Sequence, residues 1–299
     1  MDHVICVNQN SFPAKNTKSG TQLFEDALQG ILELQGTSDR FLFYLDSNNG
    51  SLFDFEIAIN FTYQQFIETC GDNDLALFLS EVEDKSPALD SLSEEQIEEM
   101  AANIFYVPNE RIDDYLDVYA LAWAMSGYLL SIATHDRWSN STINIARTDE
   151  NGRYINEFLT LKNISSQAHG LAHYQAFNEV DLKKLLSPHI ISEPLLSWFS
   201  QQIPENKTRI IDKTRLAYNR NFNGGEPLFK TLIDGDGLRE IRMSAYAGGA
   251  IRILFKPFKG QTQALLVGFI KHCDSEGYKL AIKQSNKIYS ELSSKPSLN

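Results

Sequence analysis

The chain of 299 residues contains 42% hydrophobic and 22% charged residues, and its net charge is −12. This length suggests two domains, and the hydrophobic content excludes collagen-like and fully disordered chains. No apolar run reaches the roughly 18 residues of a membrane span, and no basic, apolar secretory signal opens the chain, so we expect a cytoplasmic protein. The spacing of Cys6, Cys70 and Cys273 favours neither a disulfide framework nor a zinc site.

The charge is unevenly distributed along the sequence. Residues 1–190 carry 29 acidic and 11 basic side chains, a net charge of −18, whereas residues 191–299 carry 10 acidic and 16 basic side chains, a net charge of +6. Phosphate repels the first part and attracts the second. Pro188 and Pro194 interrupt helix propagation twice in a short passage, as expected of a linker. We therefore predict an acidic domain at 1–187 and a basic domain at 188–299.

The pattern of the amino-terminal part predicts an α/β domain. Strand-like apolar runs occur at residues 4–7, 41–45, 55–61, 129–133, 143–146 and 158–161. A helix between the first two runs is indicated by apolar residues spaced by three and four, which are Leu23, Ala27, Ile31 and Leu34. Residues 62–128 are mainly helical in pattern, with a capping-box-like start at 91–94, and residues 149–152 are typical of a hairpin turn.

Three aspartates of this part lie where some nucleases hold metal ions. Asp46 follows a predicted strand, Asp117 opens a predicted helix, and Asp136 follows the next strand. Residues 117–138 resemble the second half of a PIN-type nuclease domain, which implies divalent metal bound by such carboxylates. Aspartate is also common at these places because it caps helices and stabilises turns. Metal binding and capping are therefore alternative interpretations of Asp46, Asp117 and Asp136.

Two histidines in this part have the spacing of neighbours on one helix face. His169 and His173 could together hold a transition metal, but no acidic third ligand lies at a diagnostic spacing. Histidines that are exposed or engaged in hydrogen bonds are the simpler interpretation.

The carboxy-terminal part predicts a small α+β domain with an antiparallel sheet. Helices are expected from Ser192 and from Pro204, because each start is followed by an apolar face. Three strands at 238–244, 250–255 and 263–269 follow with short connections, and a last helix covers about 275–292. The predicted order is two helices, three strands and one helix.

Consecutive motifs over about residues 194–292 carry a family resemblance. Residues 195–228 look like a helical hairpin that leads to a glycine turn. The strands GLREIRM at 237–243, GGAIRILF at 248–255 and ALLVGFIKH at 264–272 follow, and YKLAIKQSNKIYSEL at 278–292 is an amphipathic helix. In this order the motifs resemble the RelE/HigB superfamily of toxin ribonucleases from toxin–antitoxin systems. The resemblance implies an mRNA interferase, which cleaves RNA without metal or other cofactor and acts in growth arrest or phage defence.

The resemblance also implies roles for particular residues. Arg242 and Arg252 would clamp the scissile phosphate, since the guanidinium fork binds oxyanions bidentately. Lys271 would add positive charge, and His272 or Tyr278 would transfer protons. Further contacts with RNA are expected from three basic residues, which are Arg239, Lys256 and Lys259.

Two positions depart from the family pattern. Glu240 occupies a place where active members often have a base, and Arg239 replaces an aromatic residue; Lys256 could compensate. The main prediction is an endoribonuclease toxin that cleaves either free RNA or RNA on the ribosome. Its acidic domain is expected to have a regulatory, sensing or targeting role. The partners that it implies are RNA, the ribosome and an antitoxin protein, and no membrane. A catalytically inactive protein that binds RNA or the ribosome is the second alternative, and a metal-dependent nuclease in the amino-terminal domain is the third.

Overall fold

The computed structural model describes residues 1–36, 39–46, 50–102, 104–111, 113–148, 151–178, 180–273 and 277–294. The chain divides into two compact units, Met1–Glu179 (unit 1) and Val180–Asn299 (unit 2). The passage expected to be a linker is not one. It contains β10 (Ile190–Ile191), which pairs in parallel with β14 (Gln263–Lys271), and it runs directly into α8 (Glu193–Ser200). This strand has only two paired residues, and a segment this short has no alternating apolar pattern by which the sequence could reveal it.

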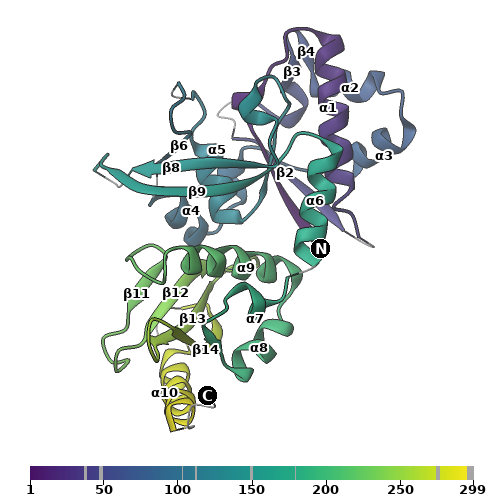
Figure 1. Cartoon of the computed structure of the whole chain (residues 1–299). Helices are drawn as coiled ribbons and strands as arrows, with labels where there is room; N and C mark the ends of the chain where they lie inside the picture. Colours follow the sequence, from purple (N-terminus) through teal and green to yellow (C-terminus); the bar gives the residue numbers. More distant parts are fainter. Residues whose placement is uncertain are drawn as a thin grey trace. The chain divides into compact units, whose positions relative to one another are not determined.

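Unit 1 contains a seven-stranded sheet in the order β5-β2-β1-β7-β9-β8-β6. Strands β5, β2, β1, β7 and β9 are parallel, and β8 and β6 are antiparallel additions at one side (Figure 1). The strands are β1 (Asp2–Val7), β2 (Arg40–Tyr44), β5 (Glu83–Lys85), β6 (Ile104–Tyr106), β7 (Tyr128–Leu130), β8 (Thr142–Thr148) and β9 (Tyr154–Ile164). The α/β character predicted for this part is therefore present.

Two sequence expectations in unit 1 need correction or lie outside the described chain. The single strand expected at 55–61 is two short strands, β3 (Glu56–Ala58) and β4 (Phe61–Thr62), which pair with each other. Asn60 between them has φ 59°, a left-handed conformation that asparagine tolerates in turns and that ends a continuous strand. The turn expected at 149–152 includes Asp149 and Glu150, which lie outside the described residues.

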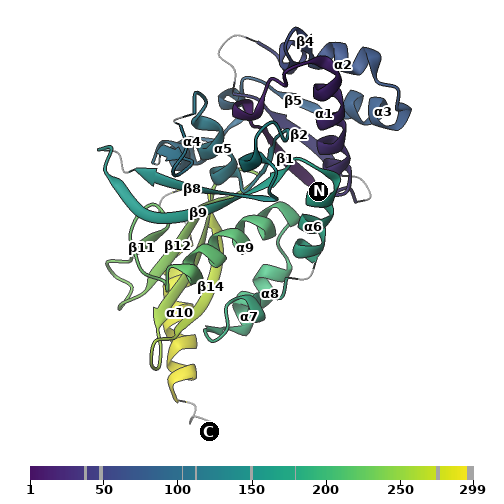
Figure 2. The same cartoon turned by 45° about the horizontal axis from the view of Figure 1, so that its top comes forward.

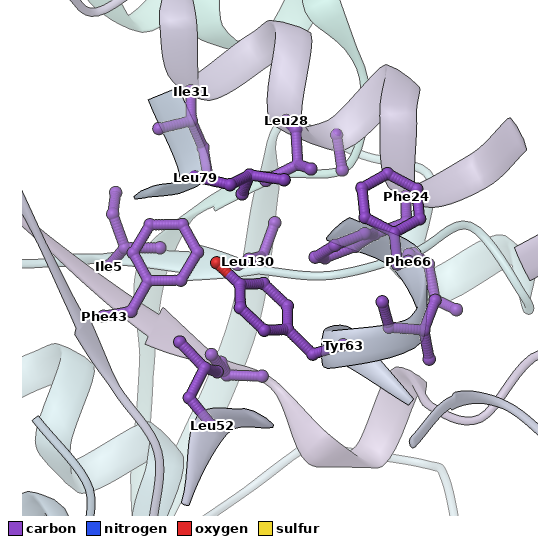
Figure 3. Packing of buried hydrophobic residues seen from close by; sticks show 14 of the residues in the cluster. Ile5, Phe24, Leu28, Ile31, Phe43, Leu52, Tyr63, Phe66, Leu79 and Leu130 are labelled. Carbon is purple, nitrogen blue, oxygen red and sulfur yellow. The ribbon is translucent and has the colours of Figure 1, made fainter. Parts of the chain in front are cut away.

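The helices of unit 1 cover a sheet whose central strand is buried on both faces. Every residue of β1 is buried, as expected of a central parallel strand. Ile5 and Val7 join a large apolar cluster with α1 (Thr17–Leu32), α2 (Tyr63–Thr69) and α3 (Asn73–Glu81). Figure 3 shows the side chains of this cluster filling the space between α1 and the strands. The predicted acidic helix is α4 (Glu94–Ala101), and Ser93 and Gln96 form its capping box.

Two glycines bring α1 and α6 (Gln167–Asn178) into very close contact. A Cβ atom on Gly170 would lie 1.7 Å from the carbonyl oxygen of Gly30. No side chain fits there, so glycine at these positions allows the two helix backbones to touch. Figures 1 and 2 both show α6 running beside α1, and α5 (Asp117–Met125) is a separate buried helix of the same unit.

Unit 2 contains a five-stranded sheet in the order β10-β14-β13-β12-β11. Strands β11 (Phe229–Thr231), β12 (Arg239–Ser244), β13 (Ala250–Pro257) and β14 form antiparallel neighbours. The helices are α7 (Leu182–Leu185), α8, α9 (Pro204–Asn219) and α10 (Tyr278–Ser294). Apolar residues of α10 pack on β13 and β14, and both cartoon views show the helix running beside these strands (Figure 2). The chain thus combines helices and sheets, and no helix in its described part is long and apolar enough to span a bilayer.

Candidate active site

One face of β12 and β13 carries charged side chains that the strand register brings together. Glu240 and Arg242 alternate along β12 and therefore project to the same face. Arg252 on β13 lies directly opposite Arg242, so it shares that face. Tyr278, the first residue of α10, reaches the same place. We call these four residues the Glu240 cluster.

The Glu240 carboxylate is the centre of the cluster. Glu240 is only 1% exposed, and its Oε1 lies 3.6 Å from the Nε atoms of both Arg242 and Arg252. The Tyr278 hydroxyl donates a hydrogen bond to Oε2 at 2.7 Å, while Arg252 Nε donates to the same hydroxyl at 3.3 Å. A buried carboxylate without such partners would be strongly unfavourable, so the two arginines and the phenol account for its burial.

The phenol ring of Tyr278 is held from two sides. The Phe269 ring packs edge-on against it, with 5.2 Å between the ring centroids. Gly277 precedes Tyr278 with φ +75°, and a Cβ there would lie 2.8 Å from the Phe269 ring. Burial and the hydrogen bond to Glu240 raise the pKa of the Tyr278 hydroxyl above its ordinary value. The hydroxyl therefore stays protonated at neutral pH and in a fixed place.

The two arginines of the cluster differ in what they can offer a ligand. Arg252 is almost fully buried, and its Nη1 donates to the carbonyl oxygens of Ile251 and Met243 at 2.8 and 3.4 Å. Arg242 keeps 27% of its side chain exposed. Phosphate clamping by both Arg242 and Arg252 stays a prediction, and the two side chains would contribute to it from unequally exposed positions. Arg242 can meet a phosphate from solvent, and Arg252 chiefly holds the carboxylate and the phenol.

A second carboxylate lies at the exposed side of Arg242. Glu226 Oε1 is 3.3 Å from Arg242 Nη1 and 3.7 Å from Lys230 Nζ. The Glu226 side chain is 62% exposed, so water and salt weaken both pairs. Glu226 is thus a weakly held anion between two cations, a position that a phosphate could also take.

The other predicted catalytic residues lie at the end of β14. Lys271 pairs with Ala250, so it is on the same sheet face as Arg252, whose partner is Phe269. His272 is exposed, and its ring lies against Gly249 at the β12–β13 turn, where an added Cβ would be 2.7 Å from Nδ1. Among the predicted proton-transfer residues, Tyr278 joins the Glu240 cluster, and His272 packs on the neighbouring turn.

The three residues predicted to contact RNA have other surroundings. Arg239 projects to the opposite face of β12, where it donates to the carbonyl oxygens of Phe222 and Gly224 and lies near two phenyl rings. Arg239 is three residues from Arg242 along the strand, so the two side chains project to opposite faces, and its contact with RNA stays a prediction. Lys256 pairs with Asp236 at 3.1 Å and lies over the Tyr289 ring, and Lys259 lies over Phe258.

The structure does not gather Asp46, Asp117 and Asp136 into a metal site. Burial, and next the charge of Asp117, raise the pKa of Asp46, so these two carboxylates are within electrostatic reach. Asp136 opens a short 3-10 helix. In the part of the chain that the structure describes, no group of three or more histidine, cysteine, aspartate or glutamate side chains is arranged to hold a metal ion.

Unit 1 has a polar network of a different kind at the carboxyl ends of β1, β7 and β9. Asn8 donates to Ser131 at 2.9 Å, and Ser131 donates to Asn163 at 2.6 Å. Asn163 in turn donates to the carbonyl oxygens of Trp138 and Asn140, at 3.0 and 2.7 Å. The three side chains of this network, which we call the Asn163 network, are fully buried.

The two histidines of α6 make hydrogen bonds, and within the part of the chain that the structure describes they are not members of a metal-binding group. His173 Nε2 donates to the carbonyl oxygens of Ser141 and Asn163, at 2.9 and 3.2 Å. His169 Nδ1 lies 3.3 Å from the backbone nitrogen and the hydroxyl of Ser165. Burial lowers the pKa of both histidines, so they are neutral at pH 7.

Sequence reasoning missed one member of the cluster. In the family pattern Glu240 is a departure, yet in the structure Glu240 contacts the two arginines and the tyrosine. The available signal was the two-residue spacing of Glu240 and Arg242, which on a strand predicts a shared face. Comparison of the chain with known protein families and with curated proteins finds no match.

Proposed function

We propose that unit 2 is a metal-independent RNA endonuclease resembling the RelE/HigB toxins. The observation that carries the proposal is the meeting of Arg242, Arg252 and Tyr278 around Glu240 on one sheet face. Residues 180–299 have 18 basic and 11 acidic side chains, a net charge of +7, which favours a phosphate-bearing substrate. An RNA substrate, free or on the ribosome, makes this a cytoplasmic activity.

Cleavage of RNA in this way requires fixed positive charge near the phosphate and a group that accepts one proton. In this reaction a ribose 2′-hydroxyl attacks the neighbouring phosphate, and negative charge builds on the phosphate oxygens. Arg242 stabilises that charge from the exposed side, with Lys271 adding positive charge on the same face. Arg252 is a positioning residue that holds Tyr278, and the phenol touches the reacting hydroxyl. No step requires a metal ion.

The test is cleavage by the full chain in the presence of EDTA. We expect RNA fragments that end in a cyclic 2′,3′-phosphate, and in cells we expect new 5′ ends in message and arrested growth. Loss of one charge-stabilising donor typically lowers kcat by about 10²–10³-fold, and we expect this of Arg242→Ala. Arg242 is a cleaner target than Arg252, because removing buried Arg252 also disturbs Glu240. Lys287→Ala, an exposed lysine of α10, is the control and should cleave normally.

Three results would overturn the proposal. Binding of RNA or ribosomes without cleavage would make the protein a binding or sensor protein. Cleavage of purified RNA that stops in EDTA would favour a metal-dependent nuclease instead, the alternative for which Asp46, Asp117 and Asp136 are the predicted ligands. Full activity of Arg242→Ala would remove the cluster from the chemistry.

We further propose that unit 1 restrains the RNA binding of unit 2. Residues 1–179 carry 28 acidic and 9 basic side chains, a net charge of −19. Joined to a unit of charge +7, they are present at high effective concentration and compete with RNA for positive charge. An antitoxin protein that acts in the same way would be a further partner.

A further inference from the structure

The chain between α9 and β11 forms a loop whose backbone is held in an uncommon conformation. We call residues 221–228 the Glu226 loop. Asn221 and Phe222 have φ of 50° and 57°, a left-handed conformation that a bulky residue such as phenylalanine rarely adopts. Such a backbone persists only where its surroundings determine it. The buried Phe222 ring packs against the rings of His189 and Phe255, with centroids 4.7 and 5.3 Å away, so it fixes the start of the loop.

Arg239 holds the same loop from β12. Its Nη1 donates to the Phe222 carbonyl oxygen at 2.7 Å, and its Nη2 donates to the Gly224 carbonyl oxygen at 2.5 Å. The planar guanidinium reaches both acceptors at once, which the single ammonium group of a lysine cannot do in the same geometry. The end of the loop is also bound to β12, because the Arg242 backbone nitrogen donates to the Leu228 carbonyl oxygen at 2.8 Å. The loop is therefore attached to β12 near both of its ends.

The attached loop brings one carboxylate to the open side of the Glu240 cluster. Lys230 pairs with Glu240 across β11 and β12, so its side chain lies on the same face as Arg242. Glu226 Oε1 lies 3.3 Å from Arg242 Nη1 and 3.7 Å from Lys230 Nζ. Each pair is exposed and weak, but the attached backbone keeps the carboxylate at a high effective concentration beside both cations. An anion from solution has to compete with it.

We propose that the Glu226 loop is an autoinhibitory contact, in which Arg239 holds the loop in place. The loop in turn keeps Glu226 on the two cations, where it competes with RNA phosphate; the identity of this ligand rests on the proposed function. Arg239 is thus a positioning residue that acts from the opposite face of β12. A phosphodiester carries one negative charge, as Glu226 does, so a single phosphate gains little by replacing it. RNA that brings several phosphates to the basic unit overcomes the competitor.

Binding of a short fluorescent RNA to the full chain at about 50 mM salt tests the competitor. Glu226→Gln removes the charge and should tighten binding about two- to fivefold. Arg239→Lys keeps the net charge but cannot make both carbonyl bonds, so the loop is freed and binding should tighten about two- to threefold. The double variant should bind no more tightly than Glu226→Gln, because Arg239 then has no competitor to hold. All differences should disappear near about 0.5 M salt.

Amide hydrogen exchange, followed by NMR, reports the state of the loop without RNA. The Phe229 amide donates to the Gly225 carbonyl oxygen at 3.0 Å, so its exchange measures how often the loop opens. Arg239→Lys should speed this exchange about tenfold. Glu226→Gln should leave it near the wild-type rate, since the exposed carboxylate contributes little to holding the backbone.

Two matched substitutions are the controls. Arg215→Lys makes the same change at an exposed arginine of α9, and Glu291→Gln removes an exposed carboxylate of α10. Both should bind RNA within about 1.5-fold of wild type and leave the exchange of the Phe229 amide unchanged.

The inference is overturned if Arg239→Lys binds RNA no more tightly than wild type although its Phe229 amide exchanges faster. It is also overturned if that exchange is unchanged, or if Arg239→Lys tightens binding equally in the Glu226→Gln background. Should Arg239→Lys fail to fold, Glu226→Gln still decides, because unchanged or weaker binding excludes a competitor. A chain that binds and cleaves RNA with no difference among the variants keeps the proposed function and loses only this inference. RNA that no variant binds overturns the proposed function, and the competitor with it.

Discussion

Each unit buries polar side chains against its sheet, but the two groups are of different kinds. The Asn163 network is neutral, and its outermost hydrogen bonds go to backbone carbonyls of the segment after β7. The Glu240 cluster is charged, and one of its cations, Arg242, keeps a side open to solvent. Neutral groups that bond only to the protein hold a loop in one conformation. Charges that remain partly open can also bind a ligand, which is why the second cluster and not the first carries the proposed chemistry.

The largest effect is expected in the free energy of unfolding, where removal of Arg252 should cost much more than removal of Arg242. Arg252→Ala leaves the Glu240 carboxylate buried with too little compensation, which typically costs about 3–5 kcal/mol. Arg242→Ala removes a partly exposed side chain and should cost about 1 kcal/mol or less. Calorimetric unfolding of the full chain measures both. Equal losses would mean that the two arginines support Glu240 alike, against the distinction drawn from their burial.

A slightly smaller loss of stability is expected from the neutral network. Asn163→Ala removes a buried side chain with three hydrogen bonds and leaves two carbonyl groups and a hydroxyl to find new partners, a cost of about 2–4 kcal/mol in the free energy of unfolding. Asn144→Ala on the exposed side of β8 is the control and should stay within about 0.5 kcal/mol. RNA cleavage by folded Asn163→Ala should match wild type. A large loss of cleavage would place chemistry in unit 1.

The contrast between the networks also explains what the sequence could and could not predict. Apolar runs identified the long strands, because each buries a continuous apolar face. Strands β10 and β11 are too short for such a signal. Arg242 and Arg252 were predicted from motifs, and their pairing follows from the register. The unequal burial of these arginines and the bond from Tyr278 to Glu240 depend on where α10 begins, a tertiary detail that no local pattern contains.

Electrostatic restraint by unit 1 should change RNA affinity by about five- to tenfold at low salt. A protease site placed after residue 179 of the full chain allows binding to be measured before and after the units are separated. We expect tighter binding after cleavage at 50 mM salt and no difference near about 0.5 M, where charge is screened. Circular dichroism before and after cleavage controls for unfolding. Unchanged affinity at low salt would assign unit 1 a sensing or targeting role instead.

Acid should lower the free energy of unfolding of both units, because each unit contains a histidine that is neutral when folded. Burial lowers the pKa of His173, although its bond to the Asn163 carbonyl opposes this, and burial also lowers the pKa of His189, whose Nδ1 accepts from the Gln263 backbone. The unfolded chain therefore takes up protons first. Their stabilisation is complete above an unfolded pKa of about 6.5 and is lost as pH falls towards the lowered folded values. Urea unfolding at pH 7.5 and 5.5 checks this, and His173→Gln should flatten the dependence of unit 1.

The smallest effect tests how Glu226 contributes at the open side of the cluster. Its carboxylate lies between Arg242 and Lys230. If RNA binds at the cluster as proposed, its phosphate would compete with this carboxylate for the two cations. Because Glu226 is well exposed, each of its pairs is worth well under 1 kcal/mol, and Glu226→Gln should tighten RNA binding only about two- to fivefold. The variant also frees two cations for phosphate, so binding should become more sensitive to salt. Fluorescence anisotropy with a short RNA across a salt series measures both quantities, and Glu291→Gln serves as the exposed control. Weaker binding by Glu226→Gln would show that this carboxylate helps to hold RNA rather than competing with it.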